Sequence, residues 1–488
     1  MLLACIALLL SLGTPTGPTL DITSLGAKGD GQTMNTSFIQ QAIDSVAATG
    51  GGVVLIPKGR FVTAVIRLKS GVELHLADSA VLEGSTHRTD YGRERASALL
   101  IADNQHDISV TGKGIIDGRG REVVADVFRM LKEGTLQDPE WQHENPWHQK
   151  RPTESNRPGL IDFKHCDNVK IIDITLKDAA AWVQTYTECN HLTLQNMRVV
   201  STAYFNNDGI DVVDCHDVHI TGCNVNAADD GICLKSSNPA SRCDTVVVEN
   251  CVVRSSASAV KFGTASRGGF KNVSIRNITV YDTYRSAIAL ESVDGGTLED
   301  VQVQGITARN TGNAIFIRLG HRRQNVPPGI IRHITIKDVT VEVPADKPDK
   351  GYETEGPGVL YPHNVFPSSI TGIPGHPVED VTLENISIIY RGKDDPAAGR
   401  YGLDSLDQVP ENEKDYPEFS MFGELPAWGF YVRHAKNIHF NHVRLSRKDP
   451  SFRPATIFDD VQGFTLEHCR PAPILARSNK DGSGSPKK

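Results

Sequence analysis

The sequence contains no basic tract and no excess of positive charge. Its 488 residues include 51 Lys and Arg against 59 Asp and Glu, a formal net charge of -8. Nucleic-acid binding depends on positive groups that neutralise phosphates, so this balance argues against a nucleic-acid partner. No Cys-x-x-Cys pair or His-x-x-x-His spacing indicates a zinc site, and no Ser-His-Asp arrangement, phosphate loop or haem motif is present. We therefore predict no nucleic-acid partner, no metal and no cofactor.

Long apolar runs are missing as well. The first twelve residues are nearly all apolar, and Gly-Thr-Pro-Thr-Gly-Pro follows them. This run is too short to span a bilayer and is typical of a secretory signal. It lacks a basic start and a clear cleavage site, and Leu3-Ala4-Cys5 leaves a lipoprotein signal open. The sequence predicts a signal peptide over residues 1–18, a secreted or periplasmic protein, and no membrane partner.

Cysteine is limited to nine residues, one of which lies in the predicted signal. Cys166, Cys189 and Cys215 each precede a strand-like run at the same place in successive repeats. Free cysteine packs as a small apolar residue, so this spacing favours a ladder of buried thiols over disulfides. An exported protein also permits bridges. The open alternative is a disulfide that joins Cys223 or Cys233 to Cys243 or Cys251.

From about residue 106 onward, the chain repeats one pattern. A turn residue is followed by alternating branched apolar residues, as in Asn168-Val-Lys-Ile-Ile-Asp-Ile-Thr-Leu and Asn272-Val-Ser-Ile-Arg-Asn-Ile-Thr-Val. The units recur about every 23 to 28 residues through the middle, which lies within the range of solenoids. A coil of that length holds three short strands, and each coil buries its inward side chains on the next, about 4.8 Å away. The pattern predicts an all-β chain folded as a parallel β-helix.

The residues before the repeats predict a cap for the open end of the β-helix. One face of a helix that ends at Gly50-Gly-Gly carries the apolar residues Phe38, Ile39, Ala42, Ile43 and Val46. Repeat arrays need atypical ends that cover the exposed core. We therefore predict an N-terminal capping helix.

Three excursions interrupt the repeats, at about residues 121–157, 345–377 and 392–428. They are rich in aromatic and charged residues, which favours ordered loops that wall a cleft. The last residues, 478–488, are polar and rich in Gly and Ser, which is typical of disorder. We predict one β-helix domain over residues 19–477 and a disordered tail.

Two consecutive repeats carry acidic residues in the same backbone context. Asp208-Gly-Ile-Asp211 is followed one repeat later by Asp229-Asp230-Gly-Ile. Carboxylates that stacked coils bring together repel one another and raise at least one pKa, which suits acid–base chemistry. A ladder of Asp turns explains the same residues without catalysis. Neighbouring coils place carboxylates about 5 to 10 Å apart, the range in which two carboxylates hydrolyse a glycosidic bond.

These motifs resemble glycoside hydrolase family 28, the polygalacturonase-like pectin hydrolases. The likeness covers about residues 21–469 and rests on Gly-Ala-Lys-Gly-Asp-Gly near the start, on Asn206-Asn207-Asp208 and on Asp229-Asp230. It implies a single-stranded, right-handed, pectin-lyase-like β-helix that hydrolyses its substrate with inversion and without a metal. By the same resemblance, Asp229 is the general acid, and Asp208 and Asp230 hold and deprotonate the attacking water.

Two departures from the family's pattern concern the substrate. The family's Gly-His-Gly falls at Ala257-Ser-Ala259, and its Arg-Ile-Lys, which grips a galacturonate carboxylate, falls at Ala289-Leu-Glu291. Losing cations and gaining an anion predicts weaker binding of an acidic sugar. The candidate substrate contacts are Asn206, Asn207, Lys261, Glu291, Arg318, His321 and Trp147. The plainer interpretations are a solvated strand lysine for Lys261 and a surface ion cluster for Arg318 and His321.

The sequence as a whole predicts a secreted, monomeric glycoside hydrolase that acts on a pectin-like or related polysaccharide. The long loops narrow the groove into a pocket, which favours exo action. A β-eliminating polysaccharide lyase on the same scaffold, with Ca²⁺ at the aspartates, is one alternative. A non-catalytic glycan-binding β-helix is the other. Unsaturated products identify a lyase, and binding without turnover identifies a binder.

Overall fold

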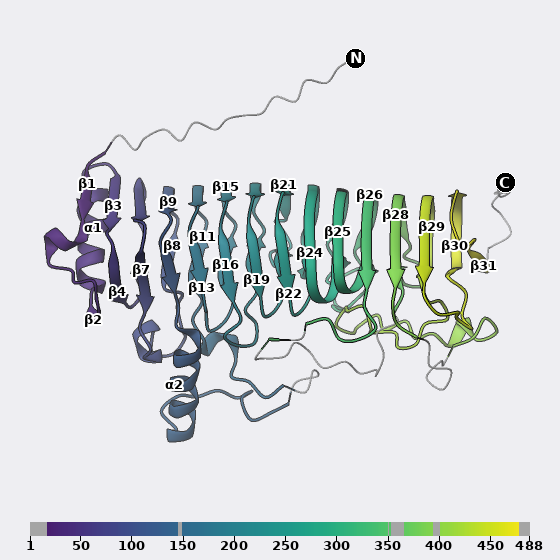
Figure 1. Cartoon of the computed structure of the whole chain (residues 1–488), viewed down its shortest axis with the longest axis horizontal. Helices are drawn as coiled ribbons and strands as arrows, with labels where there is room; N and C mark the ends of the chain where they lie inside the picture. Colours follow the sequence, from purple (N-terminus) through teal and green to yellow (C-terminus); the bar gives the residue numbers. More distant parts are fainter. Residues whose placement is uncertain (1–16, 145–148, 350, 353–365, 394–400, 478–488) are drawn as a thin grey trace, which may run out of the picture.

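The computed structural model describes residues 17–144, 149–349, 351–352, 366–393 and 401–477. Strands stack in a row along the long axis of the molecule, from the N-terminal coils at one end to the C-terminal coils at the other (Figure 1). The strands pair in parallel, each with its counterparts in the coils before and after it. The predicted parallel β-helix is confirmed.

Each early coil contains up to three strands, one for each side of the solenoid. The first side consists of β1 (Thr19–Asp21), β3 (Gly52–Ile56), β6 (Val72–Leu76), β9 (His106–Gly112), β12 (Asp167–Ile172), β15 (Asn190–Gln195), β18 (His216–Thr221) and β21 (Cys243–Glu249). The second consists of β2 (Asp30–Met34), β4 (Gly59–Thr63), β7 (Ala80–Gly84), β10 (Ile115–Asp117), β13 (Thr175–Lys177), β16 (Arg198–Ser201), β19 (Asn224–Ala227) and β22 (Val252–Ser255). The third consists of β5 (Ile66–Arg67), β8 (Leu100–Asp103), β11 (Ile161–Lys164), β14 (Gln184–Thr187), β17 (Ile210–Val213), β20 (Ile232–Ser236) and β23 (Val260–Ser266).

The later coils merge their strands into longer ones that bend around the solenoid. The long strands are β24 (Gly269–Ser292), β25 (Thr297–Leu319), β26 (Ile330–Val343), β28 (Val378–Tyr390), β29 (Phe430–Arg447) and β30 (Thr456–Glu467), whereas β27 (Ser368–Thr371) and β31 (Ile474–Arg477) remain short. Strand β24 pairs with β21, β22 and β23, so it continues all three sides. The three-sided coil therefore persists where the strand boundaries disappear.

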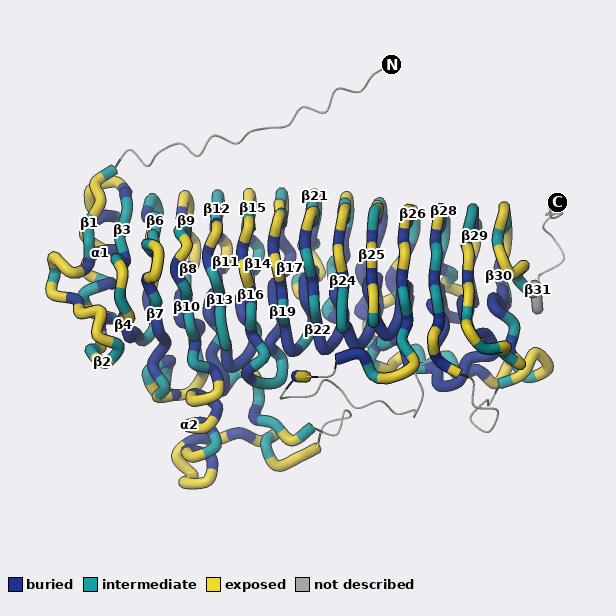
Figure 2. The backbone as a smooth tube through the Cα atoms, in the orientation of Figure 1, coloured by how far each residue is buried: buried dark blue, intermediate teal, exposed yellow. Residues whose placement is uncertain are grey.

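Turn residues with a left-handed backbone explain the repeat seen in the sequence. The first residue of successive units has φ between 51° and 57° in Asn168, His191, Asp217, Thr245, Asn272, Asp300, His333, Asp380 and Asn437. Asn and Asp tolerate this conformation better than other residues with a side chain, which is why they mark the repeat. After the turn, side chains alternate between the core and solvent, and buried stretches alternate with more exposed ones along the coils (Figure 2).

Helix α1 (Thr36–Ala48) covers the N-terminal end of the solenoid. Its residues Ile39, Ala42, Ile43 and Val46 are buried in the main core, which continues through the coils to Val461. Burying four such side chains stabilises the end by several kcal/mol, at about 25 cal/mol per Å² of apolar area. The predicted capping helix is confirmed.

A second helix, α2 (Gly120–Glu133), occupies the start of the first excursion, where the sequence predicted a loop. Val127, Met130, Leu131 and Leu136 form a small core of their own, against which Trp141 packs. The helix projects from the side of the solenoid where the later loops also lie (Figure 1). The remaining helical turns are the 3-10 segments Ile22–Leu25, Arg88–Tyr91, Glu154–Asn156 and Leu406–Gln408.

The described part of the third excursion is ordered against the outside of the solenoid. Its side chains build a second apolar core on the third side of the late coils, which consists of Leu406, Val409, Phe419, Phe422 and Leu425 packed with Phe366, Ala289, Phe316, Ala427, Tyr431 and Ile457. This core fixes residues 406–425 beside the strands. The predicted cleft wall is therefore held by packing.

The eight described cysteines are all free thiols. Cys189 and Cys215 stack in successive coils, where the Cys189 backbone N–H donates to Cys215 Sγ at 3.3 Å. The buried ladder is confirmed, and the open alternative of a disulfide between the four later cysteines is not found. Within the described residues, no helix has the length and apolar character that a membrane crossing needs.

Candidate active site

The aspartate motifs occupy one corner of the solenoid, between its second and third sides. Asp208 lies just before β17, and Asp230 lies just before β20. The backbone N–H of Gly209 donates to the carbonyl of Asp230 at 2.8 Å, and that of Gly231 donates to Ser258 at 2.8 Å. The corners therefore stack in register, and the motif repeats in space as it does in sequence.

The glycine of each Asp-Gly-Ile is required by the close approach of the next coil. A Cβ on Gly209 would lie 2.5 Å from the carbonyl oxygen of Gly231, and a Cβ on Gly231 would lie 2.4 Å from Val253 Cγ1. Both distances are shorter than real Cβ contacts, so a side chain at Gly209 or Gly231 would force the neighbouring coil to move. The shared Asp-Gly-Ile context thus follows from packing.

Asn207 shapes the loop that carries Asp208. Its Oδ1 accepts hydrogen bonds from the backbone of Ala203 at 3.1 Å and Tyr204 at 3.2 Å. Its Nδ2 donates to the carbonyls of Ala179 at 3.1 Å and Ala181 at 2.9 Å. Because the buried amide is already satisfied by the protein, Asn207 holds the loop and does not face the pocket.

Three carboxylates converge at the corner. One carboxylate oxygen from each of Asp208, Asp229 and Asp230 lies within 4.8 Å of the others. Lys235 Nζ donates to Asp208 Oδ2 at 2.9 Å, and Lys261 Nζ donates to Asp230 Oδ2 at 2.9 Å. Both lysines are buried, and ion pairing of this kind keeps like-charged carboxylates together.

The three aspartates differ in how readily they bind a proton. Burial raises the pKa of Asp229 to about 7, and the negative charges of Asp208 and Asp230 add to the effect. Burial also raises the pKa of Asp208 to about 7, against the opposing charge of Lys235. For Asp230, burial again acts to raise the pKa, but Lys261 and other cations outweigh it and hold the pKa below its usual value. The corner therefore combines a carboxylate with carboxyl groups that retain a proton near neutral pH.

Asp211 and Trp182 complete the surroundings of Lys235. Lys235 Nζ also donates to Asp211 Oδ1, and the Lys235 ammonium lies 3.7 Å from the centre of the Trp182 ring. Burial raises the pKa of Asp211 to about 6. Asp211 is fully buried and does not line the pocket, so it acts through Lys235.

A pocket of about 280 Å³ opens over these carboxylates. Besides the aspartates and lysines, residues from two excursions line it, namely Gln149, Arg151 and Glu154 from the first and Tyr416 from the third. Both excursions project from the same side of the solenoid (Figure 1). The volume is near the lower end of small-molecule sites, about 300–1,000 Å³. The aspartates thus lie in a walled pocket.

The predicted substrate contacts divide into two groups. Asn206 and Lys261 line the pocket, and Asn206 Nδ2 lies 3.3 Å from Asp229 Oδ2. Asn207, Glu291, Arg318 and His321 do not line it. Trp147 lies outside the described residues.

The contacts and burial of Arg318, His321 and Glu291 explain why these residues do not line the pocket. Arg318 donates to the carbonyls of Gly372 at 3.0 Å and Glu411 at 2.5 Å, and so ties the third excursion to β25. The His321 ring lies 2.7 Å from the Val326 carbonyl. Glu291 is buried, and burial raises its pKa to about 8 against the charge of Lys261, so it carries a proton near neutral pH.

Sequence reasoning missed several residues of the pocket lining, among them Lys235, Trp182 and Arg285. Tyr416 also lines the pocket, and the sequence predicted it only as one aromatic residue of a loop that walls a cleft. Lys235 reads as an ordinary strand lysine and Trp182 as a core aromatic in the sequence. Tyr416 is 155 residues from Lys261, which donates to its hydroxyl at 2.9 Å. No local signal in the sequence indicates such a contact.

The three aspartates are spaced closely enough to hold a metal ion. However, Lys235 and Lys261 each donate to one of these carboxylates, and Arg285 also acts to lower the pKa of Asp229 and Asp230. These buried cations already supply the positive charge that a calcium ion would bring. The chemistry of the corner therefore fits acid–base catalysis better than Ca²⁺ binding.

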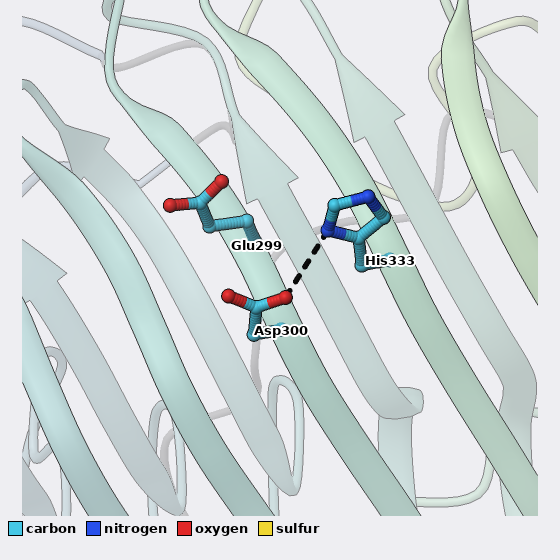
Figure 3. Close-up of side chains that lie close together, drawn as sticks. All are labelled: Glu299, Asp300 and His333. Atoms are coloured by element: carbon cyan, nitrogen blue, oxygen red, sulfur yellow. Dashed lines mark hydrogen bonds and ion pairs between the residues drawn. The ribbon is translucent and has the colours of Figure 1, made fainter.

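A second acidic group, which consists of Glu299, Asp300 and His333, lies on the strand surface (Figure 3). Arg332 donates to Glu299 Oε2 from Nε at 2.9 Å and from Nη2 at 2.6 Å, and Lys271 lies 3.0 Å from Oε1. His333 Nδ1 lies 3.1 Å from Asp300 Oδ1. The group is therefore a surface ion network, and its members Asp300 and His333 are turn residues that begin successive repeats.

A larger hollow of about 710 Å³ lies on the first side of the early coils, away from the aspartates. Its polar side chains bond one another, since Thr111 Oγ1 donates to Glu73 Oε1 at 2.5 Å and lies 2.8 Å from His75 Nδ1. The smaller pocket contains carboxyl groups whose pKa is raised by burial, Asp208 and Asp229. Perturbed carboxyl groups in a pocket mark the better candidate for an active site.

Comparison with known proteins agrees with this choice of site. The family model described as "Glycosyl hydrolases family 28" matches residues 48–348, a segment that includes the whole aspartate corner. The chain belongs to this family. It is therefore a glycoside hydrolase.

The individual proteins that the chain resembles have low sequence identity to it. A "Probable polygalacturonase" of Vitis vinifera is 24% identical over 76% of this chain and 70% of its own length. An "Exo-poly-alpha-D-galacturonosidase" of Dickeya chrysanthemi is 26% identical over 66% of this chain, which spans 62% of that protein. The solved family 28 exopolygalacturonase of Yersinia enterocolitica has a TM-score of 0.65 at 18% identity, over 93% of this chain and 79% of its own. At this identity, the structural likeness shows the fold alone.

Proposed function

We propose that this glycoside hydrolase cleaves a pectin-like polysaccharide from a chain end, with inversion and without a metal ion. Asp229 donates a proton to the leaving glycosidic oxygen. Asp230 accepts a proton from the attacking water, and Asp208 holds that water by a hydrogen bond. The water oxygen bonds to the anomeric carbon as the glycosidic bond breaks, so the reaction consumes one water for each bond cleaved.

The difference in proton affinity within the cluster carries this proposal. Burial raises the pKa of both Asp208 and Asp229 to about 7, and the charge of Asp208 adds to the rise for Asp229. Lys235 contacts Asp208 at 2.9 Å, whereas Asp229 accepts only uncharged donors among the described residues, the Asn206 amide at 3.3 Å and the Asp230 backbone N–H at 3.0 Å. The cation beside Asp208 favours its ionised form, so Asp229 is the better proton donor, and Asp230 stays ionised beside Lys261. One acid and one base are thus present together at neutral pH.

Inversion requires room for a water among the carboxylates. A single water can hydrogen-bond two carboxylate oxygens that are about 5 Å apart, and the nearest oxygens here lie within 4.8 Å. Carboxyl groups about 5–5.5 Å apart are typical of retaining enzymes, and about 6.5–9.5 Å of inverting ones. The spacing alone therefore favours neither outcome. The proposal of inversion depends on the family resemblance and on the third carboxylate, which can hold the water.

Exo action is supported by the walls of the pocket. Arg151 and Glu154 come from the first excursion, and Tyr416 comes from the third, so the pocket is narrowed by segments that are inserted before and after the aspartate coils in the sequence. A long polymer cannot lie across such a pocket without displacing one wall, whereas a chain end can enter. The apolar N-terminus supports secretion, and the capped N-terminal end supports a monomer.

The experiment is a digestion of polygalacturonate and of oligogalacturonides of defined length, with neutral and sulfated oligosaccharides beside them. Anion-exchange chromatography follows the products. We expect one monosaccharide to accumulate from the first time points and Asp229→Asn to abolish its release. Asp217→Asn is the matched control, because Asp217 lies outside the pocket in a half-buried turn with φ of 53° that asparagine also adopts. A ladder of products contradicts exo action, and products that absorb in the ultraviolet contradict hydrolysis.

A further inference from the structure

Arg285 occupies the position of Asp229 two coils further along the same corner. The backbone N–H of Ala259 donates to Ser286 at 2.9 Å, as that of Gly231 donates to Ser258 one coil earlier. The residues just before these acceptors are Ala257 and Arg285. Two coil spacings correspond to about 10 Å between the backbone positions of Asp229 and Arg285. The coil between them carries only the small side chains of Ala257 and Ser258 at this point.

The guanidinium of Arg285 is buried in the pocket wall without hydrogen bonds to the described residues. The side chain lines the pocket, and its residue is 4% exposed. Its nearest carboxylate oxygen, Glu418 Oε2, is 3.8 Å from Nε, and Nε has no hydrogen-bond partner. The Tyr416 ring lies 5.6 Å away. A buried arginine normally uses its five N–H donors, so unfilled donors at a pocket wall indicate a ligand.

Three other cations at the pocket are hydrogen-bonded to protein carboxylates. Lys235 contacts Asp208, and Lys261 contacts Asp230. Arg322 donates from Nε at 2.9 Å and from Nη2 at 2.7 Å to Asp294, which occupies its fork. Arg285 thus differs from these three in having donors to offer. Arg151 also has an unfilled Nε, but its side chain is 19% exposed to water, against 5% for Arg285.

Glu291, which replaces a cation of the family's pattern, does not oppose an anion here. It is buried, its Oε2 accepts no hydrogen bond from the described residues, and burial raises its pKa to about 8. It is therefore uncharged near neutral pH. The sequence predicted a site hostile to acidic sugars, and both this proton and Arg285 remove that expectation.

We infer that Arg285 grips the carboxylate of a uronic-acid unit that lies over Ala257 and Ser258, next to the aspartates. The guanidinium fork matches a carboxylate in two parallel hydrogen bonds. The inference rests on the proposed function, because it names the substrate class of the same site. It makes Arg285 a substrate-binding residue that replaces the missing Arg-Ile-Lys from another position in the same coil.

The test compares trigalacturonate with its fully methyl-esterified form. Wild-type protein, Arg285→Gln, Arg285→Lys and Arg267→Gln are measured for kcat and KM on both. Arg267 is an exposed arginine that donates to the carbonyl of Ser237, a residue that lines the pocket. Arg267→Gln therefore removes one positive charge near the pocket entrance and leaves the guanidinium of Arg285 in place. Circular dichroism and Tm confirm that each variant folds.

We expect the wild type to prefer the acid over the ester on the order of 100-fold, the size typical of a buried charge pair. Arg285→Gln should remove most of that preference through KM and leave the ester within about threefold. Arg285→Lys should recover part of it, because a lysine offers charge without the fork. Arg267→Gln should keep the wild-type preference. An equal loss on acid and ester, or a wild type that prefers the ester or releases only neutral sugars, overturns the inference.

Binding distinguishes this inference from the proposed function. Calorimetry in the Asp229→Asn background measures the affinity for trigalacturonate with and without Arg285→Gln. If the wild type hydrolyses nothing but binding still depends on Arg285, the proposed hydrolysis fails and the carboxylate grip stands. If hydrolysis occurs but neither binding nor selectivity depends on Arg285, the grip fails and the hydrolase stands.

Discussion

Replacing Lys261 by methionine tests the electrostatic account of the acid and the base. Lys261 Nζ lies 2.9 Å from Asp230 Oδ2, and both side chains are buried. An opposite charge this close lowers a carboxyl pKa by about 1–3 units, each worth about 1.36 kcal/mol. Lys261→Met removes that charge and keeps a side chain of similar length. The pKa of Asp230 should therefore rise by about 1–3 units.

The sign of the effect on activity follows from the roles. Asp230 must be ionised to accept the proton, so activity is lost as pH falls through its pKa, and that limb should move to higher pH by the same 1–3 units. The alkaline limb, where the proton is lost from the Asp208 and Asp229 pair at about pH 7, should move up less, because Lys261 is a weaker influence on Asp229. The profile of the variant should be narrower than that of the wild type.

The assay is kcat/KM from pH 3 to pH 9, with Tm recorded at each pH. Breaking a buried ion pair costs about 3–5 kcal/mol of stability, so activity is read only where the variant is folded. Lys271→Met is the control, since Lys271 pairs with Glu299 at 3.0 Å on the strand surface, outside the pocket. An acid limb that does not move in Lys261→Met refutes the assignment of Asp230 as the base.

Three further outcomes follow from the described contacts. In steady-state kinetics, Asp208→Asn should lower kcat by about 10²–10⁴-fold. Asp211→Asn should lower kcat by about tenfold or less, because Asp211 acts through Lys235. Equal losses in the two variants contradict this difference in role. Activity should be unchanged by prolonged dialysis against EDTA, because Lys235 and Lys261 supply the positive charge at the aspartates; a loss restored by Ca²⁺ supports a lyase-like site. A reductant should leave Tm unchanged, because the described cysteines are free thiols; a fall in Tm reveals a disulfide.

The solenoid could be predicted from the sequence because turn residues of the same kind recur once in every coil. Residues such as Asn168, Asp217 and Asn272 start each unit with a left-handed backbone, and the apolar alternation after them continues through every coil. The aspartate corner was predicted for the same reason, since Asp208 and Asp230 occupy equivalent turns. Features that repeat from coil to coil are local, and local patterns can be read from one chain.

Features that break the repeat were harder to predict. Helix α2 carries apolar residues at Val123, Val127, Met130 and Leu131, a helical spacing that marks it, but the aromatic residues after it favoured a loop. The contact of Lys261 with Tyr416 joins segments 155 residues apart, and no pattern within either segment specifies it. The protonation of Glu291 depends on its burial, which raises its pKa, and burial cannot be read from the sequence around it.

The most direct test of the proposed mechanism is the anomeric configuration of the first product. Proton NMR of the fresh hydrolysate from an α-linked oligogalacturonide resolves the two anomers before they equilibrate. Attack by a water held between Asp208 and Asp230 predicts the β anomer first, and Asp229→Asn should give no product. A first product with the α configuration requires a covalent intermediate and contradicts the roles assigned to these aspartates.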